Sequence, residues 1–172
     1  VLLYNEKDII IKKQKEKIMG AWGVRALDSD EGLDVFDEFT DYCIENDEIK
    51  MGDLLEHFKE TGFLPEKPEE IDFLYDHTVM VLAELLEEYH KNGKVIINYE
   101  NDDDEDIEEE ITNISFDKEN VSFLIEQISD ILKPKDEMHE TYELWEDSDS
   151  FQEWKEHNLV LLKTLKEIKD NL

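Results

Sequence analysis

The side chains best suited to chemistry are carboxylates and histidines, and metal binding is the first chemistry to test. Asp102, Asp104 and Asp106 are spaced two residues apart, as are the first ligands of a calcium-binding EF-hand loop. Such a loop also requires Gly at its sixth position and Glu at its twelfth, where this chain has Ile107 and Asn113. The acidic run therefore does not predict a specific calcium site.

Two carboxylate–histidine pairs have the i, i+3 spacing of helical metal ligands: Glu87 with His90, and Asp136 with His139. A carboxylate-bridged di-iron centre uses such pairs from two helices, with a further Glu from each of two others. In a chain with 48 acidic residues such pairs also arise by chance. A metal-dependent enzyme with a carboxylate–histidine cluster therefore stays an alternative, and we assign no metal ligand or cofactor.

Nucleophilic catalysis has little support in the sequence. There is no G-x-S-x-G motif and no phosphate-binding loop. The one cysteine, Cys43, lies on the apolar side of a helical pattern and is expected to be a small core residue. We assign no catalytic residue and expect a protein that is not an enzyme.

Charge is the strongest constraint on partners. The 172 residues contain 48 acids and 18 bases, a formal net charge of -30. This charge repels nucleic-acid phosphates and anionic membranes, whereas it attracts a basic protein. Solubility alone would also account for it. A DNA-mimic inhibitor is a further alternative, which requires the acids to be spaced like phosphates.

The segment "ENDDDEDIEEE", residues 100–110, is too acidic to pack, and we expect it to be a long solvated loop that contacts a basic partner. The predicted partner-binding residues are Asp102, Asp103, Asp104, Glu105, Asp106, Glu108, Glu109 and Glu110.

Hydrophobic periodicity predicts helices over about 30–45, 51–61, 68–91, 117–132, 137–147 and 151–172. Strands are expected at 95–99 and 111–116, joined by the acidic loop. The expected fold class is mainly α with minor α+β character: a single-domain, helical bundle-like fold with a small antiparallel hairpin. No apolar run is long enough to span a membrane, and we expect a cytoplasmic protein of unknown oligomeric state.

Local signals support several of these helices. Leu33, Phe36, Phe39 and Cys43 form an apolar stripe, and Ser29 or Asp30 can cap the helix that carries it. Asp117 can cap another helix. Ser150 and Glu153 have the spacing of a capping box for the last one.

The first eighteen residues differ from the rest, with five Lys and three acids. Lys15–Met19 can be encoded by a bacterial ribosome-binding sequence followed by a start codon. We therefore expect residues 1–18 to be a translated leader, with a genuine N-terminal helix as the rival reading. Residues 19–172 are then one acidic globular domain.

Two segments carry a family resemblance: "MGAWGVRALDSDEGLD" at 19–34 and "YELWEDSDSFQEWKEHNLVLLKTL" at 142–165. They resemble the two ends of a bacterial family, the domain of unknown function 4259. The matching residues that we expect to be structural are Gly20, Trp22, Gly23, Asp28, Asp30, Asp34, Trp145 and Trp154. Arg25 and Gly32 depart from the family pattern, which often has Gly and Ala at these two positions.

The resemblance implies no established activity. The three tryptophans are expected to pack in the core, because such side chains carry large apolar areas. From charge and size we expect a cytosolic acidic binding protein, with an immunity or antitoxin protein as a specific form of it.

Overall fold

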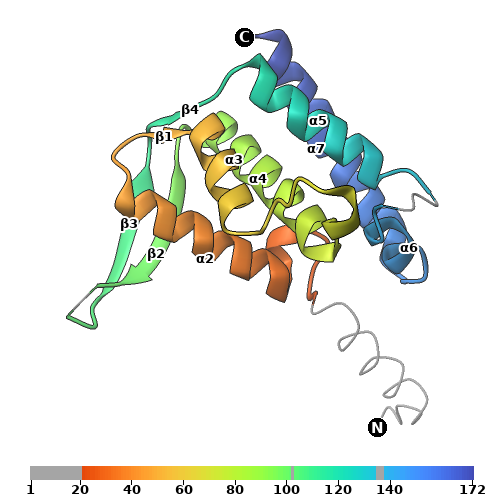
Figure 1. Cartoon of the computed structure of the whole chain (residues 1–172), viewed down its shortest axis with the longest axis horizontal. Coiled ribbons are helices and arrows are strands. Elements are labelled where there is room, and N and C mark those ends of the chain that lie inside the picture. Colours follow the sequence, from red (N-terminus) through yellow and green to blue (C-terminus); the bar gives the residue numbers. More distant parts are fainter. Residues whose placement is uncertain (1–20, 102, 135–137) are drawn as a thin grey trace, which may run out of the picture.

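The computed structural model describes residues 21–101, 103–134 and 138–172, and they form the mainly helical fold with a small antiparallel hairpin that the sequence predicts (Figure 1). The helical elements are η1 (Ala26–Asp28), α2 (Asp30–Glu45), α3 (Met51–Glu60), η2 (Pro68–Glu70), α4 (Phe73–Asn92), α5 (Lys118–Ile131), α6 (Thr141–Glu146) and α7 (Phe151–Asp170). The strands are β1 (Ile49–Lys50), β2 (Val95–Glu100), β3 (Asp106–Ile111) and β4 (Ile114–Ser115).

Helix α4 is the centre of the molecule. Every residue from Tyr75 to Leu86 is buried, as expected for a helix that is covered on all sides. Helix α2 and η1 pack on one side of α4, while α5 and α7 pack on α4 and on each other (Figure 1). Any polar side chain on this part of α4 therefore faces protein and needs a partner.

The helix boundaries follow their capping residues. Ser29 caps α2 by accepting a hydrogen bond from the Gly32 N–H, and Asp117 forms a reciprocal capping box with Asn120 on α5. The predicted capping box of α7 is wrong, because the Ser150 side chain makes no capping hydrogen bond. Helix α4 begins at Phe73 rather than 68, since η2 precedes it and Asp72 caps it.

The predicted hairpin is present, but its loop is much shorter than expected. Residues 106–110, which were assigned to the acidic loop, form strand β3 together with Ile111, and β3 pairs antiparallel with β2 from Val95↔Ile111 to Glu100↔Asp106. Backbone pairing tolerates acidic side chains when they point to solvent, and acidity alone therefore did not indicate a loop. Ile114, expected in the second hairpin strand, instead pairs with Ile49 in the parallel β1–β4 pair.

The buried face of α2 is shifted from the predicted stripe. Phe39 and Cys43 are buried as expected, and Val35 joins them, whereas Leu33 is 43% exposed. Helix α6, predicted over 137–147, is confined to six residues.

Five sequence assignments fall on residues that are not described: the leader at 1–18, the proposed start at Met19, the family-like Gly20, the predicted partner-binding Asp102 and the candidate metal ligand Asp136. Within the described residues, no helix is both long enough and apolar enough to cross a membrane.

Candidate functional site

The first family-like segment folds back on itself in front of α2. Ala21 forms an isolated antiparallel bridge with Ser29, and the Trp22 N–H donates to the Asp28 carbonyl at 2.9 Å. Gly23 lies so close to the Asp28 carboxylate that a Cβ there would overlap it. This closed loop leaves the Trp22 side chain 63% exposed. The expectation that Trp22 packs in the core was therefore wrong.

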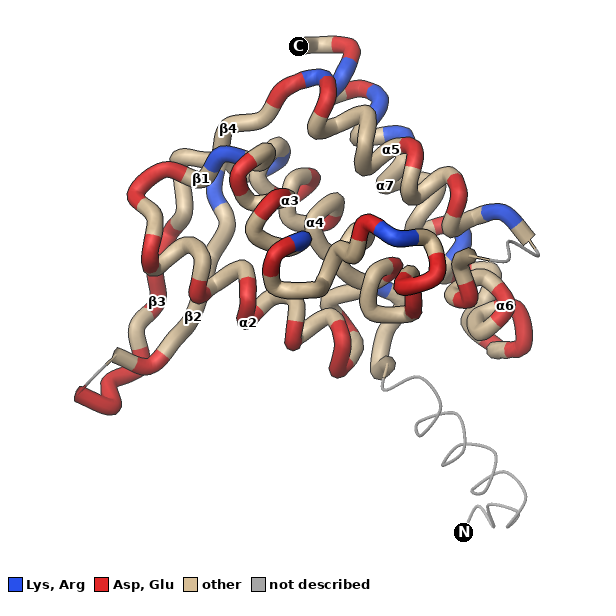
Figure 2. The backbone as a smooth tube through the Cα atoms, in the orientation of Figure 1, with Lys and Arg blue, Asp and Glu red and all other residues tan. Residues whose placement is uncertain are grey.

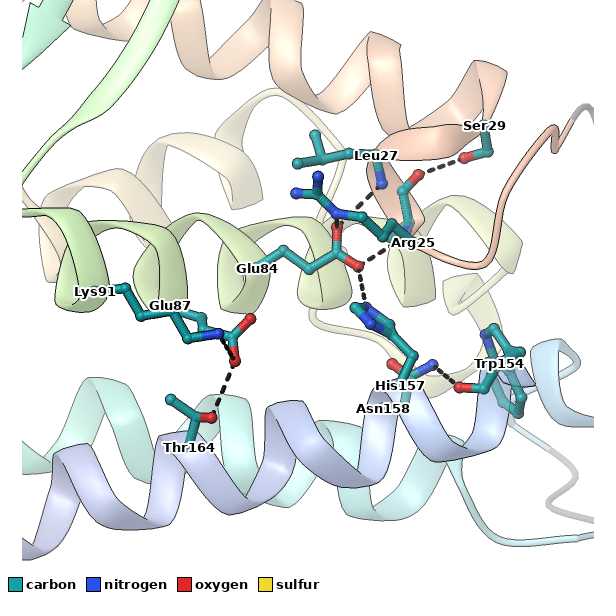
Figure 3. Close-up of polar contacts among 11 residues, drawn as sticks. Arg25, Leu27, Ser29, Glu84, Glu87, Lys91, Trp154, His157, Asn158 and Thr164 are labelled. Atoms are coloured by element: carbon teal, nitrogen blue, oxygen red, sulfur yellow. Dashed lines mark hydrogen bonds and ion pairs between the residues drawn. The ribbon is translucent and has the colours of Figure 1, made fainter. Parts of the chain in front are cut away.

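A buried carboxylate on α4 holds this loop in place (Figure 3). Glu84 is 2% exposed and accepts hydrogen bonds from the backbone N–H groups of Ala26 at 2.9 Å and Leu27 at 3.2 Å. The His157 Nε2 atom on α7 lies 2.8 Å from the same carboxylate, and the Arg25 Nε atom lies 3.9 Å from it. Glu84 thus joins η1, α4 and α7 through one side chain.

A second buried carboxylate on α4 ties down the segment before α6. Asp76 is fully buried, with its Oδ1 atom 2.5 Å from His139 Nδ1 and its Oδ2 atom 2.5 Å from the Thr141 hydroxyl.

Sequence reasoning missed Asp76 and Glu84. Their signal was the presence of two acids, eight residues apart, in a mainly apolar stretch, because charges in such a stretch must find buried partners.

The second family-like segment forms an aromatic cluster in the core. Trp145 and Trp154 are buried, and their rings stack at 5.6 Å with an interplanar angle of 9°. Tyr142 and Phe151 add edge and stacked contacts to Trp154. These two tryptophans have the structural environment that the sequence predicted.

Of the two carboxylate–histidine pairs suggested as metal ligands, Glu87 with His90 does not form. Glu87 instead contacts Lys91 at 2.9 Å and the Thr164 hydroxyl at 3.0 Å, while His90 is exposed. His139 pairs with Asp76, and Asp136 lies outside the described residues. Among the residues that are described, no three His, Cys, Asp or Glu side chains are grouped to share a metal ion.

Cys43 is unsuited to nucleophilic chemistry. Burial raises the pKa of its thiol to about 12, and the nearby Glu109 carboxylate acts in the same direction. The thiolate, which is the reactive form, is therefore scarce at neutral pH.

The predicted partner-binding acids are divided between a turn and a strand. Asp103, Asp104 and Glu105 lie in the hairpin turn, where the Asn101 side chain accepts the N–H groups of Asp103 and Glu105, each at 3.0 Å. The other described members, Asp106, Glu108, Glu109 and Glu110, lie on β3.

Opposite residues of an antiparallel pair share a face of the sheet, and the register therefore divides the hairpin acids. The outer face carries three exposed cross-strand pairs: Ile96 with Glu110, Asn98 with Glu108, and Glu100 with Asp106. Glu109 lies on the other face, where the Tyr99 hydroxyl donates to it at 3.1 Å. The outer half of the hairpin extends beyond the helices (Figure 1).

A second acidic surface lies along α2, where Figure 2 shows acidic residues recurring from end to end. The helix carries seven acids and no Lys or Arg. Its family-like acids Asp30 and Asp34 are exposed, as is Asp37. Partial burial raises the pKa of Asp37, and repulsion from Asp34 and Asp41 adds to the shift.

Comparison with known proteins adds one match. Neither the curated proteins nor the solved structures include a match to this chain. A family model does match, over residues 20–157, which contain the closed loop, all of α4 and the Trp145–Trp154 pair. On this match the chain belongs to the family described as domain of unknown function (DUF4259).

Proposed function

We propose that this protein is a non-enzymatic, cytosolic binding protein that engages a basic protein through the outer face of the β2–β3 hairpin. The observation that supports the proposal is the composition of that face. Its six residues include four carboxylates and no base. A projecting, single-sign surface raises the rate at which an oppositely charged protein associates with it.

The cross-strand pairing adds a physical reason for a partner. Glu100 lies directly opposite Asp106, and like charges in that position destabilise a strand pair. Only one of the four carboxylates, Glu110, has a cationic contact in the described residues, with Lys94. A Lys or Arg side chain of a partner beside Glu100 and Asp106 would relieve the repulsion.

An affinity capture tests the proposal. The full chain is used as bait in lysate of the source cell, with washes at about 50 mM and then about 500 mM NaCl, because salt screens exposed charge pairs. We expect a basic protein that is retained at low salt and released at high salt. The hairpin variant E100Q/D106N/E108Q/E110Q should lose it.

A matched control removes the same number of charges elsewhere. The variant E126Q/E140Q/E143Q/D147N changes four exposed acids of α5, α6 and their flanks. It should retain the partner. If no basic protein is captured, or if both variants behave alike, the hairpin does not carry the function and the charge serves solubility.

Within this proposal, the specific partner class that we propose is a basic toxin, which the protein neutralises by covering it. Small size and high negative charge support this form of the proposal. Co-expression with the captured protein tests it. The partner alone should arrest growth, the wild-type chain should restore growth, and the hairpin variant should not. A partner that is harmless when expressed alone would rule out the toxin.

A further inference from the structure

The exposed side of α2 combines charge with apolar side chains in a way that the hairpin does not. Leu33 is 43% exposed and Ile44 is 46% exposed, although both are large and apolar. Asp34, Asp37 and Asp41 are exposed on the same helix. At 100° per residue the five positions fall within an arc of about 100°. We call them the α2 outer face.

The three aspartates of this face are uncompensated. Within the described residues none of them takes part in an ion pair. By contrast, Glu38, on a neighbouring side of the same helix, has its carboxylate 2.6 Å from His57 Nε2. The raised pKa of Asp37 reflects partial burial and the repulsion among the three. The face therefore holds negative charge that no Lys or Arg of the described residues neutralises.

The face is also held rigidly. The opposite side of α2 buries Val35 and Phe39, and its first turn is fixed by Ser29, whose hydroxyl donates to the Ala26 carbonyl at 2.7 Å. A surface that is ordered before binding loses little conformational entropy when a partner docks. Two apolar side chains at fixed positions can then act as anchors.

We infer that the α2 outer face is a docking site for a basic, amphipathic helix of the partner protein. This inference rests on the proposed function, because it assigns a second contact surface to the same basic partner. Leu33 and Ile44 are eleven residues apart, or about 16 Å along the helix axis, which spans three turns of a second helix. Apolar side chains of that helix cover the two anchors, and its Lys or Arg side chains pair with the aspartates between them.

Charge disfavours two other occupants, a membrane and a second copy of the chain. An anionic membrane is repelled by Asp34, Asp37 and Asp41. A second copy of this chain carries the same net charge of -30 and presents the same acidic face. A basic helix is the occupant for which both the apolar anchors and the carboxylates are favourable.

An NMR titration of the isotope-labelled full chain tests the inference with two synthetic peptides of about 18 residues, roughly the length of α2. One is an amphipathic Lys/Leu helix, and the other has the same lysines with Ser in place of Leu. We expect the Lys/Leu peptide to shift the α2 amide signals and to bind at least about tenfold more tightly than the Lys/Ser peptide.

Matched variants distinguish binding at Leu33 and Ile44 from non-specific binding to exposed apolar side chains. L33S/I44S should weaken binding of the Lys/Leu peptide about tenfold, and D34N/D37N/D41N should weaken it and flatten its salt dependence. L159S/V160S changes two exposed apolar residues of α7 and should have no effect. Circular dichroism checks that each variant is folded.

The outcomes distinguish this inference from the proposed function. Equal binding of the two peptides, or unchanged binding by L33S/I44S, would overturn the α2 docking site. If the shifts map to the hairpin and the hairpin variant abolishes them, the α2 site fails while the hairpin function stands. If neither peptide binds at low salt, the α2 docking site fails, whereas the hairpin function is decided by the affinity capture.

Discussion

Glu84 shows how one buried carboxylate can position a loop that has little core of its own. Its two oxygens accept two backbone N–H groups of η1 and contact His157 on α7. A carboxylate can do this because it offers several acceptor sites at once, whereas an amide offers one oxygen. The closed loop that presents Trp22 therefore depends on a residue about sixty positions away.

Glu84→Gln should destabilise the protein by about 2–4 kcal/mol, since it removes the charge and leaves buried donors with a poorer acceptor. Urea unfolding followed by circular dichroism measures this. Glu87→Gln is the control on the same helix, and it should cost under about 1 kcal/mol because that carboxylate is nearer the surface. Equal effects of the two changes would contradict the role of Glu84.

His77 gives a pH dependence with a defined sign. It is 3% exposed, its Nδ1 atom lies 2.9 Å from the Phe73 carbonyl, and burial lowers the pKa of its imidazole. The carboxylates of Glu31, Asp76 and Glu84 oppose that shift without overcoming it. The unfolded chain therefore binds a proton at higher pH than the native protein does.

Stability from this group is fully present above the unfolded pKa of about 6.5 and is lost as pH falls from there toward the lower native pKa. His77→Gln should make the free energy of unfolding less dependent on pH between about 7.5 and 5 than in wild type, by at most about 1.4 kcal/mol per pH unit. Urea unfolding across this range measures the difference. His90→Gln, at an exposed position of α4, should keep the wild-type dependence.

At the scale of elements, the start of α2 depends on close approach of two backbones. A Cβ on Gly32 would overlap the Ala26 carbonyl of η1, whereas a Cβ on Gly52 of α3 would meet only the Asn120 amide nitrogen at 3.6 Å. Both glycines lie in the first turn of a helix. They therefore form a matched pair.

Gly32→Ala should lower the free energy of unfolding by about 2 kcal/mol or more, because η1 must move away from α2. The melting temperature should fall accordingly. Gly52→Ala should leave stability unchanged or raise it by up to about 1 kcal/mol, since Ala favours the helix. Calorimetry of the two variants measures both effects. A tolerated Gly32→Ala would show that η1 can shift without cost.

Sequence reasoning predicted the elements whose signals are local. Helices α2, α3 and α5 and the first hairpin strand follow from apolar periodicity and caps such as Asp117. The strand β3 and the β1–β4 pair were missed because cross-strand pairing depends on distant partners, such as Ile49 with Ile114.

The arrangement of the candidate site also depends on contacts between residues far apart in the sequence. The acidic composition indicated the hairpin acids, but their division between two faces depends on the register with β2. The exposure of Trp22 depends on Gly23, Asp28 and the distant Glu84. No local pattern separates an exposed tryptophan in a closed loop from a buried one such as Trp154.

At the scale of the whole molecule, the net charge of -30 opposes folding and favours association with a basic partner. Compaction brings carboxylates together, as along α2, and their repulsion is stronger in the native state than in the expanded chain. Added salt screens both effects. Salt should therefore act with opposite signs on stability and on binding.

We expect the melting temperature to rise by about 3–6 °C between about 20 and 300 mM NaCl, over the range in which the Debye length falls below the spacing of surface charges. Differential scanning calorimetry measures this, with sucrose of equal osmolality as the uncharged control.

D34N/D37N/D41N should be more stable than wild type at low salt and should respond less to NaCl, since three mutually repelling carboxylates are gone. E60Q/E126Q/E143Q removes the same charge from exposed positions on three different helices, α3, α5 and α6, and should change the response less. If the melting temperature of the wild type does not depend on salt, the acidic surface does not destabilise the native state. Repulsion along α2 would then give no reason for that face to bind a partner.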